Sequence, residues 1–319
     1  MKDKNGIRPV DLTKVKTYPI RDRENKVSVT DFAYPASAGQ TISSWLDSLP
    51  KILAGRDFIE LVQAIVKAKA ESRPVIAMMG GHVVKCGLSP VIISMMEHGI
   101  LTGIAMNGAT SIHDFEIAII GGTSEDVGTN IEDGIFGMWD ETGGLMNSAI
   151  NERLNKDMGM GEALGQKLID INAEYQNMSI LASALRLNIP ATVHVAIGTD
   201  IIHQHPQADG TVIGQTSFID FRIFAAEVSD LEGGVLINFG SAVIMPEVFL
   251  KALSIARNLG HKVTEFTTAN FDMFQHYRPK ENILKRPTNM GGIGYAITGH
   301  HEIMIPLLAC AVMDRMLSG

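Results

Sequence analysis

Three polar side chains follow closely on an apolar run near the middle of the chain. The run 195–197 is followed by Asp200, His203 and His205. A carboxylate such as Asp200 accepts hydrogen bonds from sugar hydroxyls and attracts cations. Histidine transfers protons near neutral pH, binds anions when it is charged, and ligates metals. We therefore expect this segment to contribute to a catalytic or cofactor-binding site.

This segment is one of five apolar runs that end in glycine and polar residues. The runs predicted as strands cover residues 74–81, 101–108, 191–198, 233–240 and 261–270. Helical spacing or helix-end signals predict helices over residues 58–71, 88–99, 151–168, 179–188 and 246–260. The alternation predicts an α/β fold, a Rossmann-like, mostly parallel sheet with helices on both faces. Right-handed crossovers bring the carboxyl ends of such strands to one edge, where ligands bind, so the five polar clusters are expected to meet there.

The histidines leave three interpretations open. They transfer protons near neutral pH, they bind a metal, or they only form hydrogen bonds to loop backbone. For a metal such as zinc, the pair His203 and His205 would have to meet the pair His300 and His301. A third ligand would come from a carboxylate: Asp114, Asp200 or Glu302.

Residues 121–144 form a segment rich in glycine and acidic side chains. A long segment of this kind is typical of a lid or an interface arm, although it is also compatible with a solvated loop. Its carboxylates, among them Glu125, would attract a cation, and Trp139 would supply an aromatic wall beside it.

The composition excludes several classes of protein. The chain has 319 residues, of which 45% are hydrophobic, so it can form a large core. Its net charge is −8, so it lacks the basic surface that binding to nucleic acids or anionic membranes requires. No apolar run is long enough to span a bilayer, and two cysteines with no signal peptide favour the cytoplasm. Residues 1–45 are polar and contain prolines, which predicts an N-terminal arm, and residues 46–319 are expected to form a single α/β domain.

No standard nucleotide-binding, serine hydrolase or zinc protease motif occurs, but the clusters together resemble deoxyhypusine synthase. The resemblance is spread over residues 74–310. It includes "LNIPATVHVAIGTD", the turn in "VLINFGSAV", "TTANFD" followed by "YRPKE", and the closing helix in "HHEIMIPLLA".

This resemblance implies a Rossmann-like fold, NAD as the cofactor, a homotetramer or homodimer with sites near the subunit interface, and a small amine as substrate. The residues expected at the cofactor are Gly81, Gly108, Asp200, Gly240, Ser241, Ala269, Asp272 and His300. Those expected at the substrate are Asp114, Glu281, His301 and Trp139. The expected catalytic residues are His113, His203, His205 and Lys285.

The chain departs from the family in its catalytic lysine and its carboxylates. The family's Trp-Gly-Lys tripeptide is absent, and Lys285 is the nearest lysine to take its place. Histidines stand where the family has carboxylates that meet the polyamine. We therefore expect NAD-dependent dehydrogenation of an amine and transfer through an imine, but not deoxyhypusine synthesis itself. A metal-dependent hydrolase or lyase and a non-catalytic nucleotide-binding sensor are the alternatives.

Overall fold

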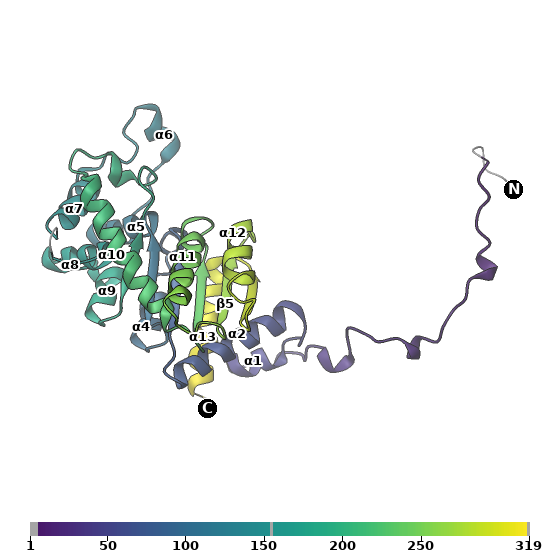
Figure 1. The fold of residues 1–319 in the computed structure, drawn as a ribbon. Coiled ribbons are helices and arrows are strands. Elements are labelled where there is room, and N and C mark those ends of the chain that lie inside the picture. Colours follow the sequence, from purple (N-terminus) through teal and green to yellow (C-terminus); the bar gives the residue numbers. More distant parts are fainter. Residues whose placement is uncertain (1–5, 154–155, 318–319) are drawn as a thin grey trace.

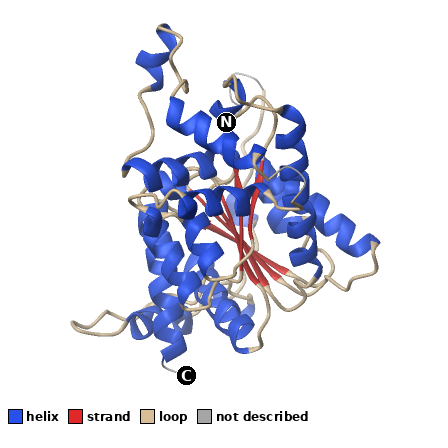
Figure 2. Ribbon diagram, turned by 90° about the vertical axis from the view of Figure 1, so that its left-hand side faces the viewer, coloured by secondary structure: helices blue, strands red, loops and turns tan. Residues whose placement is uncertain are grey.

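A sheet of six parallel strands forms the centre of the computed structural model, which describes residues 6–153 and 156–317 (Figure 2). The strands are β1 (Val75–Met79), β2 (Gly103–Asn107), β3 (Ala191–His194), β4 (Val235–Phe239), β5 (Thr267–Asp272) and β6 (Ile293–Thr298). Their order in the sheet is β3-β2-β1-β4-β5-β6. This is the strand order of doubly wound dinucleotide-binding folds, in which the direction of winding reverses between β1 and β4.

Helices cover both faces of the sheet. The α-helices are α1 (Ile42–Ser48), α2 (Leu53–Ala70), α3 (His82–Lys85), α4 (Ser89–Glu97), α5 (Gly108–Ile120), α6 (Val127–Glu132), α7 (Asp140–Asn151), α8 (Met160–Asp170), α9 (Ile180–Arg186), α10 (Gly210–Ser229), α11 (Ile244–Asn258), α12 (Tyr277–Pro279) and α13 (His301–Leu317). Short 3-10 turns are η1 (Leu12–Lys14), η2 (Ile20–Asp22), η3 (Val29–Asp31), η4 (Gln176–Met178) and η5 (Ile201–Gln204), and η6 (Lys280–Lys285) is a π-helical turn.

The core consists of two apolar clusters, one on each face of the sheet. Strand β1 contributes Val75, Ala77 and Met79 to the larger cluster, with α2, α4, α5, α9 and α13. Its alternate residues Ile76 and Met78 pack into the smaller cluster, with α10, α11 and η6. Because successive side chains of a strand point to opposite faces, a strand covered on both faces needs a continuous apolar sequence.

The predicted fold class is confirmed, with several local corrections. The segment predicted as a strand from residue 261 becomes β5 only at Thr267. Strand β6 and the long helix α10 were not expected. Residues 108–120, for which the sequence predicted no helix, form α5, because the Asn107 side chain accepts hydrogen bonds from the Thr110 amide (3.0 Å) and hydroxyl (2.7 Å) and so caps the helix.

Residues 6–30 run away from the body of the protein as an extended arm (Figure 1), whereas the Tyr34 amide donates to the Ser48 carbonyl at 2.9 Å. Helix α1 begins at Ile42 and packs against α13. None of the helices in the described ranges combines the length and the apolar character needed to cross a bilayer.

Candidate active site

The two glycine-containing turns after β1 and β4 meet where the winding of the sheet reverses. A Cβ atom on Gly80 would lie 2.8 Å from the Gly240 carbonyl oxygen, and Gly240 itself has a φ of 68°, in the left-handed region. Ligands of such sheets bind outside the strand ends at this reversal, since the backbones there leave a crevice. The two turns can approach each other and a ligand closely because they carry no side chains.

His301 lies beside this crevice with one nitrogen unpaired. Its ring contacts Gly240 so closely that a Cβ atom there would overlap Nε2, and only 9% of the residue is exposed. Within residues 6–153 and 156–317, its Nδ1 is buried and has no hydrogen-bond partner. Burial lowers the pKa of His301, while the nearby Asp272 carboxylate acts in the opposite direction. A buried, unpaired ring nitrogen costs free energy, which a polar ligand atom would recover.

His300 points outward instead. It is largely exposed, and its Nδ1 lies 3.7 Å from a carboxylate oxygen of Glu302. The sequence predicted both histidines at the site, His300 at the cofactor and His301 at the substrate, but only His301 is buried.

A second feature of the same edge is a cavity of about 230 Å³ over β1, β2 and β3. Residues 121–139, which we call the covering segment, form part of its wall. The lining residues are Lys85, Ala109, Ile112, His113, Glu116, Ser124, Glu125, Val127, Phe136, Thr199, Asp200 and Ile201. Positions 109, 112, 113 and 116 of α5 share one helix face because they are three or four residues apart. Helix α5 therefore presents His113 and Glu116 to the same space.

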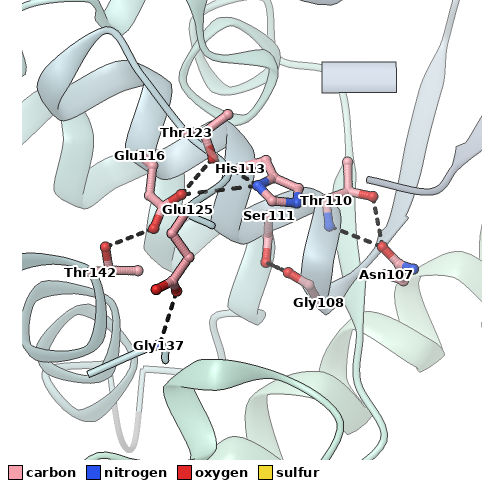
Figure 3. Close-up of polar contacts among 10 residues, drawn as sticks. All are labelled: Asn107, Gly108, Thr110, Ser111, His113, Glu116, Thr123, Glu125, Gly137 and Thr142. Carbon is pink, nitrogen blue, oxygen red and sulfur yellow. Dashed lines mark hydrogen bonds and ion pairs between the residues drawn. The ribbon is translucent and has the colours of Figure 1, made fainter. Parts of the chain in front are cut away.

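His113 has a defined proton arrangement in this cavity (Figure 3). The Thr123 hydroxyl donates to Glu116 Oε2 at 2.5 Å, because a carboxylate can only accept. The Thr123 oxygen then accepts from His113 Nδ1–H at 2.7 Å. Nε2 keeps its lone pair and lies near the turn after β1, 3.4 Å from where a Cβ atom on Gly81 would be. Burial, and next the charge of Lys85, lower the pKa of His113 to about 4, so the ring is neutral at pH 7.

Asp200 lies at the carboxyl end of β2 although it follows β3. Its carboxylate fills the space beside Gly108, where a Cβ atom would overlap it. Oδ2 is buried without a hydrogen-bond partner, and burial raises the pKa of Asp200 to about 6 against the lowering effect of Thr199. The amides of Gly198 and Asp200 donate to His203 Nδ1 at 3.1 and 3.4 Å, which places the His203 proton on Nε2. This Nε2 is also buried and unpaired.

His205 and Asp114 are engaged in the framework around the cavity. His205 is buried, and its Nε2 donates to the Gly137 carbonyl at 2.8 Å, which fastens η5 to the covering segment. Asp114 is fully buried and accepts hydrogen bonds from the Ser179 hydroxyl (2.6 Å) and the Ile180 amide (2.7 Å), so it caps α9. Neither residue lines the cavity. Trp139 is the N-cap of α7 and is 41% exposed.

Lys285 and Glu281 lie on η6 and pair with each other at 2.9 Å. The preceding turn of η6 packs beside Gly294, near the start of β6, and the Thr268 hydroxyl donates to the Ile283 carbonyl at 2.9 Å. The structure thus brings η6 to the amino-terminal half of the sheet and does not bring Lys285 together with His113 or Asp200.

The remaining predicted cofactor residues are divided between the edge and the core. Asp272 is the last residue of β5 and stands at the carboxyl edge. Ala269 is buried in the middle of that strand. Ser241 is buried after β4, and its hydroxyl accepts from the Met245 amide at 3.2 Å at the beginning of α11.

The two histidine pairs do not converge on a common point. Within residues 6–153 and 156–317, no three His, Cys, Asp or Glu side chains are grouped closely enough to hold a metal ion. The zinc arrangement considered from the sequence therefore lacks the geometry it requires.

Sequence reasoning missed Lys85 in the cavity lining and the two threonines that bond to Glu116, Thr123 and Thr142. Lys85 ends the first helix after β1, so its position at the edge could have been inferred from the strand prediction. The Thr142 hydroxyl donates to Glu116 Oε1 at 2.9 Å from α7. Nothing in the local sequence around either threonine indicates a contact with Glu116.

Comparisons with known proteins identify relatives at the level of the fold. No protein-family model and no curated protein sequence matches the chain. A solved structure of a putative deoxyhypusine synthase from Entamoeba histolytica is similar over 88% of this chain and 96% of its own, with a TM-score of 0.51 and 12% identity. The fold of this chain is therefore deoxyhypusine synthase-like.

Two further solved structures are similar over much of this chain. AgrE in a ternary complex with ornithine and NAD+ matches 85% of this chain, with a TM-score of 0.52 and 12% identity. The match covers 35% of AgrE, so this chain spans about a third of that protein. A conserved putative LOR/SDH protein from Methanococcus maripaludis S2 covers 88% of this chain and 72% of its own at 17% identity, with a TM-score of 0.49.

Proposed function

We propose that the protein is an NAD-dependent enzyme that dehydrogenates a small amine in the cavity over β1, β2 and β3. The observation that carries the proposal is the neutral His113, whose Nε2 lone pair is available in a small cavity beside the crevice where the sheet reverses. The NAD+ bound to AgrE and the putative deoxyhypusine synthase of the same fold support this cofactor and an amine substrate.

The crevice and its neighbours fit a dinucleotide. The turns at Gly80, Gly81 and Gly240 allow a diphosphate to approach the backbone. The unpaired atoms Asp200 Oδ2 and His301 Nδ1 provide an acceptor for ribose hydroxyls on one side of the crevice and a polar contact on the other. Bound NAD would supply the acceptor for a hydride.

The residues of the cavity suit the loss of a hydride from a carbon that bears nitrogen. The amine binds in its neutral form, and His113 Nε2 accepts an N–H proton as the hydride leaves the carbon and a C=N bond forms. Glu116, Glu125 and Asp200 give the lining an acidic character, which attracts amines from solution, where they are cationic. The walls exclude part of the water that would hydrolyse an imine.

We also propose that the imine formed by dehydrogenation is transferred to a second amine. This transfer requires an amine that attacks the new C=N bond, and Lys85 is the lysine among the lining residues, whereas Lys285 lies beside the start of β6. Borohydride reduction during turnover, followed by mass spectrometry of peptides, would place a covalent adduct on Lys85, on Lys285 or on neither. An adduct on Lys85 supports a protein-bound carrier, and no adduct supports direct transfer to a second substrate.

A homo-oligomer is part of the same proposal. Large apolar side chains are exposed around the carboxyl edge, including Met273, Phe274 and Ile303. Burial of such a patch between copies would remove it from water. Light scattering with size-exclusion chromatography would show a dimer or tetramer, and a monomer at all concentrations would contradict this part.

The first test is calorimetric titration of the protein with NAD+, followed by assays of amines and amino acids through the absorbance of reduced nicotinamide. We expect His113→Gln to bind NAD+ as the wild type does and to lose turnover by about 10²–10⁴-fold. His98→Gln is the matched control, because His98 is exposed near the end of α4 and bonds to the Ser94 carbonyl. Failure to bind NAD+, or full turnover by His113→Gln, would overturn the proposal.

A further inference from the structure

The covering segment is joined to α5 through the side chain of Thr123. Helix α5 ends at Ile120, and the φ of 67° at the following Gly121 lets the chain turn back over the helix. This turn brings Thr123 over the face of α5 that carries His113 and Glu116, as Figure 3 shows. The hydroxyl of Thr123 is the link between the two side chains.

The hydrogen bonds in this group permit one proton arrangement. Both oxygens of Glu116 accept, one from Thr123 (2.5 Å) and one from Thr142 (2.9 Å). Because Thr123 has one hydroxyl proton and donates it to Glu116, its oxygen is left to accept from His113. The ring proton must therefore be on Nδ1, and Nε2 is the free base.

Glu116 also lies close enough to act on the charge of the ring. Its Oε2 is 3.9 Å from His113 Nδ1, and both side chains are mostly buried, with 13% and 18% exposed. A carboxylate at this distance stabilises the imidazolium that forms when Nε2 accepts a proton. The other charged or titratable groups near the ring are His82 and Lys85 from α3, and Glu125 and Asp200 line the same cavity.

The covering segment is held in place at both ends. Near its beginning Thr123 bonds to α5, and near its end the Gly137 carbonyl accepts from His205. Within the segment, the Gly137 amide donates to Glu125 Oε1 at 2.9 Å and so joins its two ends. The Gln204 side chain donates to the Phe136 carbonyl at 2.8 Å. The orientation of the His113 ring therefore depends on the seated position of this segment.

We propose that Thr123 and Glu116 are positioning residues for His113: they fix its Nδ1–H tautomer and stabilise its protonated form when the covering segment is seated. This inference rests on the proposed function, because it assigns a purpose to the free Nε2. It goes beyond that function because it makes the basicity of His113 on α5 depend on Thr123 of the covering segment.

The direct test is the tautomer of His113, measured by long-range proton–nitrogen NMR of the full-length protein labelled with ¹⁵N in histidine. The His113 signals are assigned by their loss in His113→Gln. We expect the wild type and Thr123→Ser to carry the proton on Nδ1, because serine keeps the hydroxyl. Thr123→Val keeps the shape but has no hydroxyl, and we expect its Nε2–H tautomer to become populated. An unchanged tautomer in Thr123→Val overturns the inference.

The kinetic test uses the same variants with the amine substrate. Thr123→Val and Glu116→Gln should lower kcat by about 10²-fold or more with a smaller change in KM, and Thr123→Ser should recover most of the loss. Thr129→Val is the control, since Thr129 belongs to α6 of the same segment and is outside the cavity lining. Equal kcat values for Thr123→Val and the wild type would contradict the inference.

The two proposals fail in distinguishable ways. If His113→Gln keeps full turnover, the proposed function is wrong whatever the tautomer is. If His113→Gln is inactive while Thr123→Val retains both the Nδ1–H tautomer and the wild-type kcat, the function stands and the positioning role of Thr123 falls.

Discussion

The carboxylate of Asp200 occupies the space in which a side chain at Gly108 would begin. All three outer atoms of the carboxylate lie within 2.8 Å of the position of a Cβ atom on Gly108. Strand β2 ends at Asn107, so this contact brings a residue that follows β3 to the end of the neighbouring strand. The buried Oδ2 that results has no hydrogen-bond partner among the described residues and is the acceptor that we assign to a ribose hydroxyl.

Gly108→Ala should therefore displace Asp200. We expect the Kd for NAD+ to rise about tenfold, equivalent to about 1.4 kcal/mol, because the carboxylate can no longer stand at the end of β2. The overpacking should also lower the free energy of unfolding by about 1–3 kcal/mol. Calorimetric titration and urea denaturation measure the two effects.

Gly144→Ala provides the control for this variant. Gly144 lies within α7, and a Cβ atom on it would meet open space. Alanine is better than glycine in a helix by about 0.5–1 kcal/mol, so this variant should be as stable as the wild type or more stable, with unchanged NAD+ affinity. If Gly108→Ala behaves in the same way, the contact with Asp200 has no role in binding.

His301→Ala should weaken NAD+ binding while the protein stays folded. Its ring packs against Gly240, its Nδ1 is buried and unpaired among the described residues, and one lost hydrogen bond is worth about 1 kcal/mol, or about fivefold in Kd. His300→Ala should change Kd less, because the His300 side chain is mostly exposed. Calorimetry on both variants makes the comparison, and the reverse ranking would place His300 rather than His301 at the cofactor.

The sheet was predictable where its strands are covered on both faces. Strand β1 is apolar at every position and was recognised as a buried strand. Strand β6 was missed because it lies at the edge of the sheet and four of its six residues are exposed. Buried side chains such as Val263 and Phe266 made the segment before β5 resemble a strand, although they fill the core from a connecting segment.

The sequence predicted those positions in the site that depend on a single strand or helix, but not the contacts between separate elements. The positions of Asp200 and Gly108 at the carboxyl edge follow from parallel strands. Once Asn107 is recognised as a helix N-cap, the three-residue spacing of His113 and Glu116 places their side chains next to each other on one face of the helix. The contacts of Thr123 and Thr142 with Glu116 join three separate elements, and such packing has no signature in a local sequence.

Binding of NAD+ should depend on pH through Asp200. Burial raises the pKa of this carboxyl to about 6. The ionised form accepts hydroxyl hydrogen bonds better than the neutral acid, so affinity should increase as pH rises through about 6. Asp200→Asn should bind more weakly at pH 8 and lose this part of the pH dependence. Titrations of both proteins across this range measure it, and an equally steep dependence in Asp200→Asn would assign the effect to another group.

Stability should depend on pH through a second buried aspartate, Asp220 of α10. It is fully buried and accepts hydrogen bonds through Oδ2 from the amides of Gly161 (2.9 Å) and Val193 (2.7 Å). Burial nevertheless raises its pKa to about 7, so the folded protein binds a proton more tightly than the unfolded chain does. Between the ordinary pKa of 3.8 and about 7, the free energy of unfolding should therefore fall as pH rises.

Asp220→Asn isolates this contribution, because an amide oxygen can accept the same two hydrogen bonds and does not ionise. Each unit of pKa shift corresponds to about 1.4 kcal/mol, so the variant should lose less stability than the wild type between acidic and neutral pH. Other buried carboxyls with raised pKa values, Asp114 and Glu227, remain in both proteins and contribute a common background. Urea denaturation of the two proteins at a series of pH values gives the difference, and parallel curves would show that Asp220 ionises in the folded protein as it does in the unfolded chain.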